Sequence, residues 1–213
     1  MAFLPFSKRA RNWEPIATAL RRIAGVHDGA SLVPEDLADK VGLCLVDAHS
    51  ALSGFSEADR RHLLVTARGR WSGGVLPLKL PDGRCICILN PTHPHRRNRI
   101  TLMEEIVHTH RNHRPTGLRE IMPGLRVRDY DQAQETEAYG IGASALLPWS
   151  TFYHMLDQGT QVSAIADAYD VTTQLVEYRI KITGATNLYR NRCARSSNLQ
   201  IDKRHSEEIR HRH

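Results

Sequence analysis

The segment 74–113 constrains the fold most, because strand and helix patterns follow one another directly within it. Val75–Leu80 and Arg84–Leu89 alternate or run apolar, as strands do, and a typical turn sequence, Pro81-Asp82-Gly83, separates them. Apolar residues at helical spacing follow over 99–113. The segment therefore predicts a β-hairpin followed by a helix, so that a helix lies beside a small sheet.

The rest of the chain is predicted to be mainly helical. Further helices are expected in four segments: 14–24, 34–41, 131–148 and, as a set of short helices, 149–184. In the first of these, Pro15 is expected in the first turn. One more strand is predicted at 43–47, whereas 114–130, with two prolines and two glycines, is expected to be a loop.

Charge is distributed unevenly along the 213 residues. The net charge of +6 hints at nucleic acid, but residues 1–22 and 190–213 each carry +4 and residues 23–189 carry −2. The basic surplus therefore belongs to the ends of the chain. Weak nucleic-acid contact by these termini is one hypothesis, and the polar segment 190–213 is expected to be a disordered tail.

Several functional classes are not supported by the sequence. No apolar run reaches the roughly 20 residues of a membrane span, and the start lacks the apolar core of a signal peptide. The four cysteines contain no Cys-x-x-Cys pair and suggest a reduced, cytoplasmic protein. Phosphate-binding glycine loops and a nucleophile elbow are absent from the sequence as well.

The most informative chemical pattern is Glu104-Glu105-Ile-Val-His108 in the predicted helix 99–113. Glu104 and His108 are four residues apart, so they lie on one helix face and can reach one cation. Glu105 points about 100° away, as the glutamate does in the His-Glu-x-x-His zinc motif. In that motif the glutamate is the general base.

A third metal ligand has to come from another segment. Glu135 and Glu137, at the start of the predicted helix 131–148, are plausible donors, and small residues after them allow close packing on the first helix. His113, near the end of the first helix, is a lower-ranked alternative.

Three elements in order resemble the ImmA/IrrE family of metallo-endopeptidases. They are the strand Ile86–Asn90 with the helix Arg99–His108, the segment from Glu135-Thr-Glu-Ala138 to Ala145-Leu-Leu-Pro148, and Val162–Ile180. The resemblance runs from Pro34 to about Gly184 and implies an α+β, minimal zincin-like fold. In it a small antiparallel sheet lies beside the metal-binding helix, and a helix-turn-helix-like subdomain follows.

The resemblance also implies a ligand set with one departure from the family motif, since Glu104 stands where the first histidine is usual. Glu104, His108 and Glu137 would hold one divalent ion, with Glu105 as the base and Glu135 as the alternative to Glu137. Zinc is the metal that the family implies. The second carboxylate shifts the preference toward manganese or iron(II) and weakens activation of the bound water.

The implied function is cleavage of a helix-turn-helix repressor in the cytoplasm. The alternative is a catalytically inactive regulatory module that binds a protein partner or DNA on the same scaffold. Autonomous DNA binding by 162–182 has little support, because only Arg179 and Lys181 are basic in its second helix. The predicted divisions of the chain are 1–30, 31–148, 149–189 and the tail 190–213.

Overall fold

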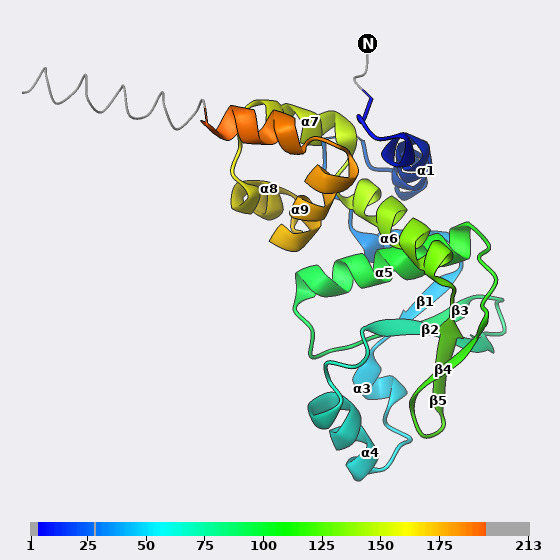
Figure 1. The fold of residues 1–213 in the computed structure, drawn as a ribbon. Coiled ribbons are helices and arrows are strands. Elements are labelled where there is room, and N and C mark those ends of the chain that lie inside the picture. Colours follow the sequence, from blue (N-terminus) through cyan, green and yellow to red (C-terminus); the bar gives the residue numbers. More distant parts are fainter. Residues whose placement is uncertain (1–3, 28, 195–213) are drawn as a thin grey trace, which may run out of the picture.

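The computed structural model describes residues 4–27 and 29–194 and has an α+β fold. A helix, α5 (His95–His110), lies beside a small sheet, and α6 (Gln132–Leu146) packs on α5 (Figure 1). α1 (Lys8–Ala24) lies against α6 on the side away from the sheet. The other helices are α2 (Pro34–Lys40), α3 (Ala48–Ala51), α4 (Glu57–Arg61), the π-helix η1 (His62–Thr66), α7 (Trp149–Asp157), α8 (Val162–Tyr169) and α9 (Thr173–Ile182). None of the helices in this part of the chain is long and apolar enough to cross a membrane.

The three-stranded sheet has the order β1 (Leu43–Val46), β3 (Cys85–Leu89), β2 (Gly73–Lys79). β2 and β3 pair antiparallel, which confirms the predicted hairpin. β1 pairs with β3 in parallel, so the sheet is mixed and not antiparallel throughout. β2 forms one edge of the sheet. The chain then reverses direction, so that β3 lies between β2 and β1.

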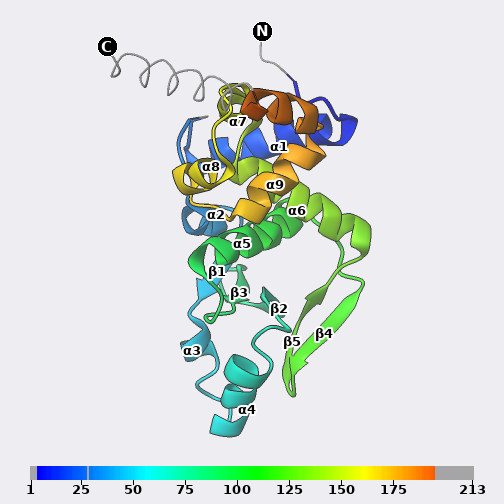
Figure 2. The ribbon, with the colours of Figure 1, turned by 60° about the vertical axis from the view of Figure 1, so that its left-hand side comes forward.

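The expected loop at 114–130 is wrong, because it folds as a second hairpin. β4 (Gly117–Met122) and β5 (Leu125–Asp129) pair antiparallel, and Gly124 turns between them with φ +81°. Val127 of β5 is fully buried and packs on Gly74 of β2, where an added Cβ would lie 2.6 Å from Val127 Cβ. This close contact holds the hairpin beside β2, below the crossing of α5 and α6 (Figure 2).

The first helix begins earlier than predicted. The Ser7 hydroxyl caps α1 by accepting a hydrogen bond from the Ala10 N–H at 3.1 Å, so Pro15 lies inside the helix and not in its first turn. Pro15 is exposed there. The sequence signal for the earlier start of α1 is therefore the serine at its N-cap, which the spacing of apolar residues does not reveal.

The segment 162–182 forms the predicted helix-turn-helix. α8 ends at Asp170, which adopts φ +50°, and the Thr172 hydroxyl caps α9. Arg179, one of the two basic residues of α9, is fully buried, as is Arg21 in the basic N-terminal segment. Neither side chain is therefore available to a nucleic acid.

The C-terminal helices share one hydrophobic core with α1, α5 and α6. Its members include Trp13 of α1, Met103 of α5, Ile141 of α6, Phe152 of α7 and Leu175 of α9. The helices of 149–184 thus pack onto α1, α5 and α6 without a separate core. Of the predicted tail, 190–194 are helical, and 195–213 lie outside the described residues.

Gly140→Ala is expected to destabilise the fold, because α1 crosses α6 at this glycine. A Cβ at Gly140 would lie 2.1 Å from Cζ3 of Trp13. Overpacking of this kind lowers the free energy of unfolding by about 1–3 kcal/mol, which urea denaturation would measure. Gly69→Ala is the control, because nothing lies within 4 Å of its added Cβ. Equal midpoints for the two variants would contradict the described contact.

Candidate active site

α5 presents its chemical groups at a close crossing with α6. Met103, Ile106 and Val107 are fully buried and anchor α5 in the core. On α6, Gly142 allows this approach, since an added Cβ would lie 3.1 Å from Met103 Cβ. Glu104 and Glu105, which lie between Met103 and Ile106 in the sequence, are half-buried beside the crossing.

His108 is the best-positioned member of the site. Its residue is only 2 % exposed, and its ring stacks on Tyr130 with centroids 3.7 Å apart and planes at 15°. Its Nδ1 lies 2.9 Å from Nδ1 of His113, and its Nε2 lies 3.6 Å from Oε2 of Glu135. The two nitrogens therefore face different partners, one of them a carboxylate of α6.

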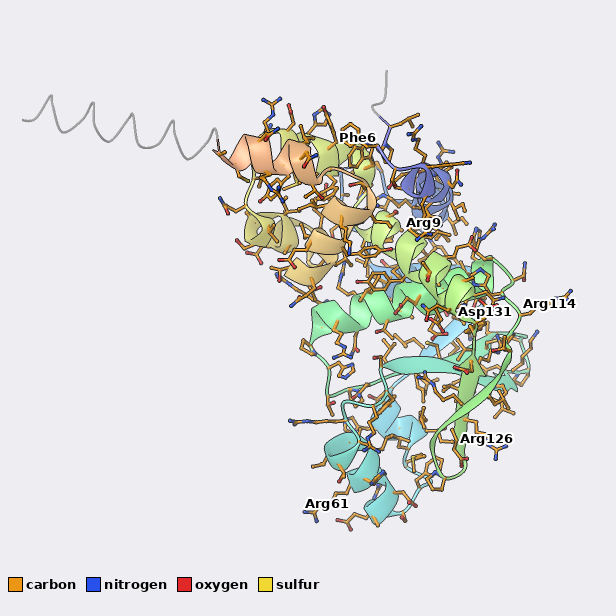
Figure 3. All side chains as sticks on the ribbon, viewed as in Figure 1. Phe6, Arg9, Arg61, Arg114, Arg126 and Asp131 are labelled. Atoms are coloured by element: carbon orange, nitrogen blue, oxygen red, sulfur yellow. The ribbon has the colours of Figure 1, made fainter. Side chains whose placement is uncertain are left out.

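The carboxylates surround a polar pocket of about 350 Å³ between α5, α6, β2 and the second hairpin. Its lining residues are Ser72, Gly73, Thr101, Glu104, Glu105, Arg119, Arg128, Asp129, Tyr130 and Glu135. A second pocket of about 280 Å³ is also lined by Glu104 and Glu135. Figure 3 shows where the hairpin meets this region: Asp131 stands at the start of α6, and Arg126 lies near the hairpin turn, away from α5.

Burial and the charges of neighbouring carboxylates raise the pKa values of two of these carboxyls. Burial, then the charges of Glu105 and Glu135, raise the pKa of Glu104 to about 8. Burial is also the main cause that raises the pKa of Glu105 to about 7, with Glu135 adding to it, while His108 and two arginines act in the opposite direction. Both carboxyls are therefore partly or largely protonated at neutral pH, and a bound cation would favour their charged forms.

The two candidate third ligands have different surroundings. Glu135 faces Nε2 of His108, as described above. Glu137 instead accepts a hydrogen bond from Nε of Arg111 at 3.1 Å, and its Oε2 lies 3.4 Å from Nε2 of His113. The structure therefore brings Glu104, Glu105 and Glu135 around one pocket, sets His108 against Glu135 beside it, and places Glu137 and His113 behind His108.

The residues present fit a divalent cation in donor type and charge. Glu104 and Glu135 offer carboxylates, His108 offers an imidazole nitrogen, and Oε2 of Glu105 is buried without a hydrogen-bond partner among the described residues. Within 4–27 and 29–194, no three His, Cys, Asp or Glu side chains are already gathered closely enough to hold a metal ion. The residues thus fit a divalent cation by the chemistry of their donor atoms and by their proximity, not by a coordination geometry assembled in the part of the chain that the structure describes.

Sequence reasoning missed the residues of the second hairpin. Tyr130, Arg119 and Arg128 line the pocket from a segment expected to be a loop. Burial, followed by the charge of Glu105, raises the pKa of Tyr130 to about 12, so its hydroxyl keeps its proton at neutral pH. The alternation of apolar and charged residues in Leu125-Arg-Val-Arg-Asp129 was the available signal.

Comparison with known families identifies the family of the chain. No curated protein matches the sequence. The family model described as the IrrE N-terminal-like domain, Peptidase_M78, matches residues 65–181, which include β2, β3, the second hairpin, α5 and α6. The match covers more than half of the chain. The chain therefore belongs to the IrrE N-terminal-like family of metallopeptidases.

Proposed function

We propose that the protein is a metal-dependent endopeptidase whose site lies between α5, α6 and the second hairpin. One observation supports this most: Nε2 of His108 faces Oε2 of Glu135 at 3.6 Å, beside a pocket that Glu104 and Glu105 also line. Three carboxylates at one pocket, with an imidazole against one of them, form a donor set suited to a divalent cation.

Glu104, His108 and Glu135 are the residues that would hold the ion. When bound, a divalent ion polarises a peptide carbonyl and acidifies water, which is the chemistry that such a hydrolysis needs. Glu105, the next residue around the helix, would accept a proton and return it to the leaving amine.

The choice of metal follows from the ligands. Two carboxylates and one imidazole accept zinc, the metal usual for metallopeptidases, but they favour harder ions more than two imidazoles would. We therefore propose zinc, manganese or iron(II), and expect Glu104→His to increase zinc occupancy. Elemental analysis of native protein and of this variant would measure the change.

The substrate is proposed to be a helix-turn-helix repressor, cleaved in the cytoplasm to relieve repression. The resemblance of the chain to the ImmA/IrrE peptidases supports this proposal. It is tested by incubating the full chain, loaded with zinc, manganese or iron(II), with a proteome-derived peptide mixture and with repressors encoded beside its gene. Cleavage that depends on Glu105 is the expected result, and no cleavage with any of the three metals would contradict the proposal.

Glu135→Gln is expected to abolish tight metal binding, whereas Glu137→Gln is expected to weaken it by at most about 100-fold. The reason is that Glu135 faces Nε2 of His108, while Glu137 contacts Arg111 and His113. Calorimetric titration with zinc would measure both variants. The opposite ranking would identify Glu137 as the third ligand.

A further inference from the structure

The end of α5 has a backbone geometry that brings two histidines together. Asn112 adopts φ +53°, its N–H donates to the Thr109 carbonyl at 3.1 Å, and the His113 N–H donates to the His108 carbonyl at 3.0 Å. These paired bonds define the Schellman type of helix ending, in which the residue after the left-handed position turns back over the last helical turn. His113 is consequently placed against His108 by the backbone itself.

The side chains form a continuous chain of contacts behind the pocket. Nδ1 of His113 lies 2.9 Å from Nδ1 of His108, and Nε2 of His113 lies 3.4 Å from Oε2 of Glu137. Only 2 % of the His108 side chain and 8 % of the His113 side chain are exposed. Since water has little access, the two rings must satisfy their nitrogens largely through each other and through the flanking carboxylates of Glu137 and Glu135.

The position of each proton follows from this chain of contacts. A neutral imidazole has one N–H and one acceptor nitrogen, and only one proton fits between the two Nδ1 atoms. The Glu137 carboxylate accepts from Nε of Arg111 at 3.1 Å, and its Oε2, 3.4 Å from Nε2 of His113, can accept only if that nitrogen carries the proton. The contact of His113 with Glu137, at 3.4 Å, is shorter than that of His108 with Glu135, at 3.6 Å, which favours a proton on Nε2 of His113. Nδ1 of His113 then accepts, and His108 donates from Nδ1.

This proton arrangement leaves a lone pair on Nε2 of His108. That nitrogen faces Oε2 of Glu135 at 3.6 Å, and two acceptors facing one another repel unless positive charge lies between them. The tautomer set by Glu137 and His113 is thus the one in which His108 can act as a metal ligand.

We propose that Glu137 and His113 form a positioning relay that fixes the His108 tautomer with its lone pair toward Glu135. The relay rests on the proposed function only in that the lone pair is used to bind a metal. It assigns Glu137 to a role behind the ligand, and it makes His113 a positioning residue. Outer partners of this kind orient a ligating histidine and raise its basicity.

The relay is tested first on the metal-free full chain, by nitrogen NMR of the histidine rings. Wild type should show His108 protonated at Nδ1. His113→Leu, which removes the acceptor but keeps an apolar side chain, should convert a large part of His108 to the Nε2–H form. His113→Asn, whose side-chain oxygen can replace the Nδ1 acceptor, should restore the wild-type spectrum. Protonation of wild-type His108 at Nε2 would overturn the proposal.

Zinc affinity, measured against a competing chelator, provides the second readout. His113→Leu should weaken binding by about 10- to 100-fold, and His113→Asn should recover most of the loss. His110→Leu is the matched control, because His110 lies on the same helix two residues from His108. Equal affinities for wild type and His113→Leu would overturn the relay. Absence of zinc binding in every protein would overturn the proposed peptidase site and leave the tautomer result standing.

Discussion

Glu105→Gln is expected to lower peptide hydrolysis by about 100- to 10,000-fold while the protein keeps its metal. The amide has nearly the same shape as the carboxyl group but cannot accept the proton, so only the acid–base step is lost. Because Glu105 is half-buried and its Oε2 has no hydrogen-bond partner among the described residues, removing the charge should not lower stability. Cleavage rate, metal content and melting temperature, measured on one preparation, check the three parts.

The matched control for this variant is Glu177→Gln, an exposed glutamate on α9 outside the pocket. It should cleave, bind metal and melt as wild type does. Unchanged cleavage by Glu105→Gln would show that another group takes the proton. Loss of metal would instead show that Glu105 is a metal ligand. Glu104 would then be reassigned as the general base.

Arg179→Met is expected to lower the free energy of unfolding by about 3–5 kcal/mol. Arg179 is fully buried, pairs with Oε1 of Glu14 at 2.6 Å and donates to Oγ of Ser144 at 2.8 Å and to the Leu147 carbonyl. Glu14 also accepts from the Trp149 N–H at 3.2 Å, at the start of α7. Removal of the guanidinium therefore leaves several buried acceptors unpaired where α1, α6, α7 and α9 meet.

Urea denaturation followed by tryptophan fluorescence would measure this loss. The control is Arg84→Met, which breaks an ion pair with Asp39 of the same 2.6 Å length but with side chains 35 % and 69 % exposed. Such a surface pair contributes about 0–1 kcal/mol. Adding Glu14→Gln to Arg179→Met should recover part of the stability, because it removes the uncompensated carboxylate. A loss of under about 1 kcal/mol for Arg179→Met would contradict the described network.

Local sequence patterns were sufficient wherever one segment supplied the whole signal. The alternation and turn residues of 74–90 predicted the hairpin of β2 and β3, and the structure confirms it. The same holds for α6, whose predicted bounds of 131–148 differ little from Gln132–Leu146. In both, local propensity and burial favour the same structure, so no distant contact was needed to decide it.

Patterns were insufficient where packing between distant segments decided the result. Prolines and glycines predicted a loop at 114–130, but burial of Val127 against Gly74 stabilises a hairpin there. That hairpin places Tyr130 on His108 and two arginines at the pocket. The sequence also could not decide whether Glu135 or Glu137 faces His108. Two residues at this spacing on one helix point in nearly opposite directions, and only the packing of α6 on α5 determines which direction is toward His108.

The sequence by itself determined that Glu104 and His108 share one face of a helix, with Glu105 beside them, because helical periodicity is a property of the chain alone. It also contained the Asn112-His113 pair that ends α5. Only the tertiary structure decided which carboxylate of α6 faces His108, because that depends on how α5 and α6 cross at Gly142 and Met103. Burial at that crossing likewise raised the pKa of Glu104, since desolvation comes from neighbours that the local sequence does not specify.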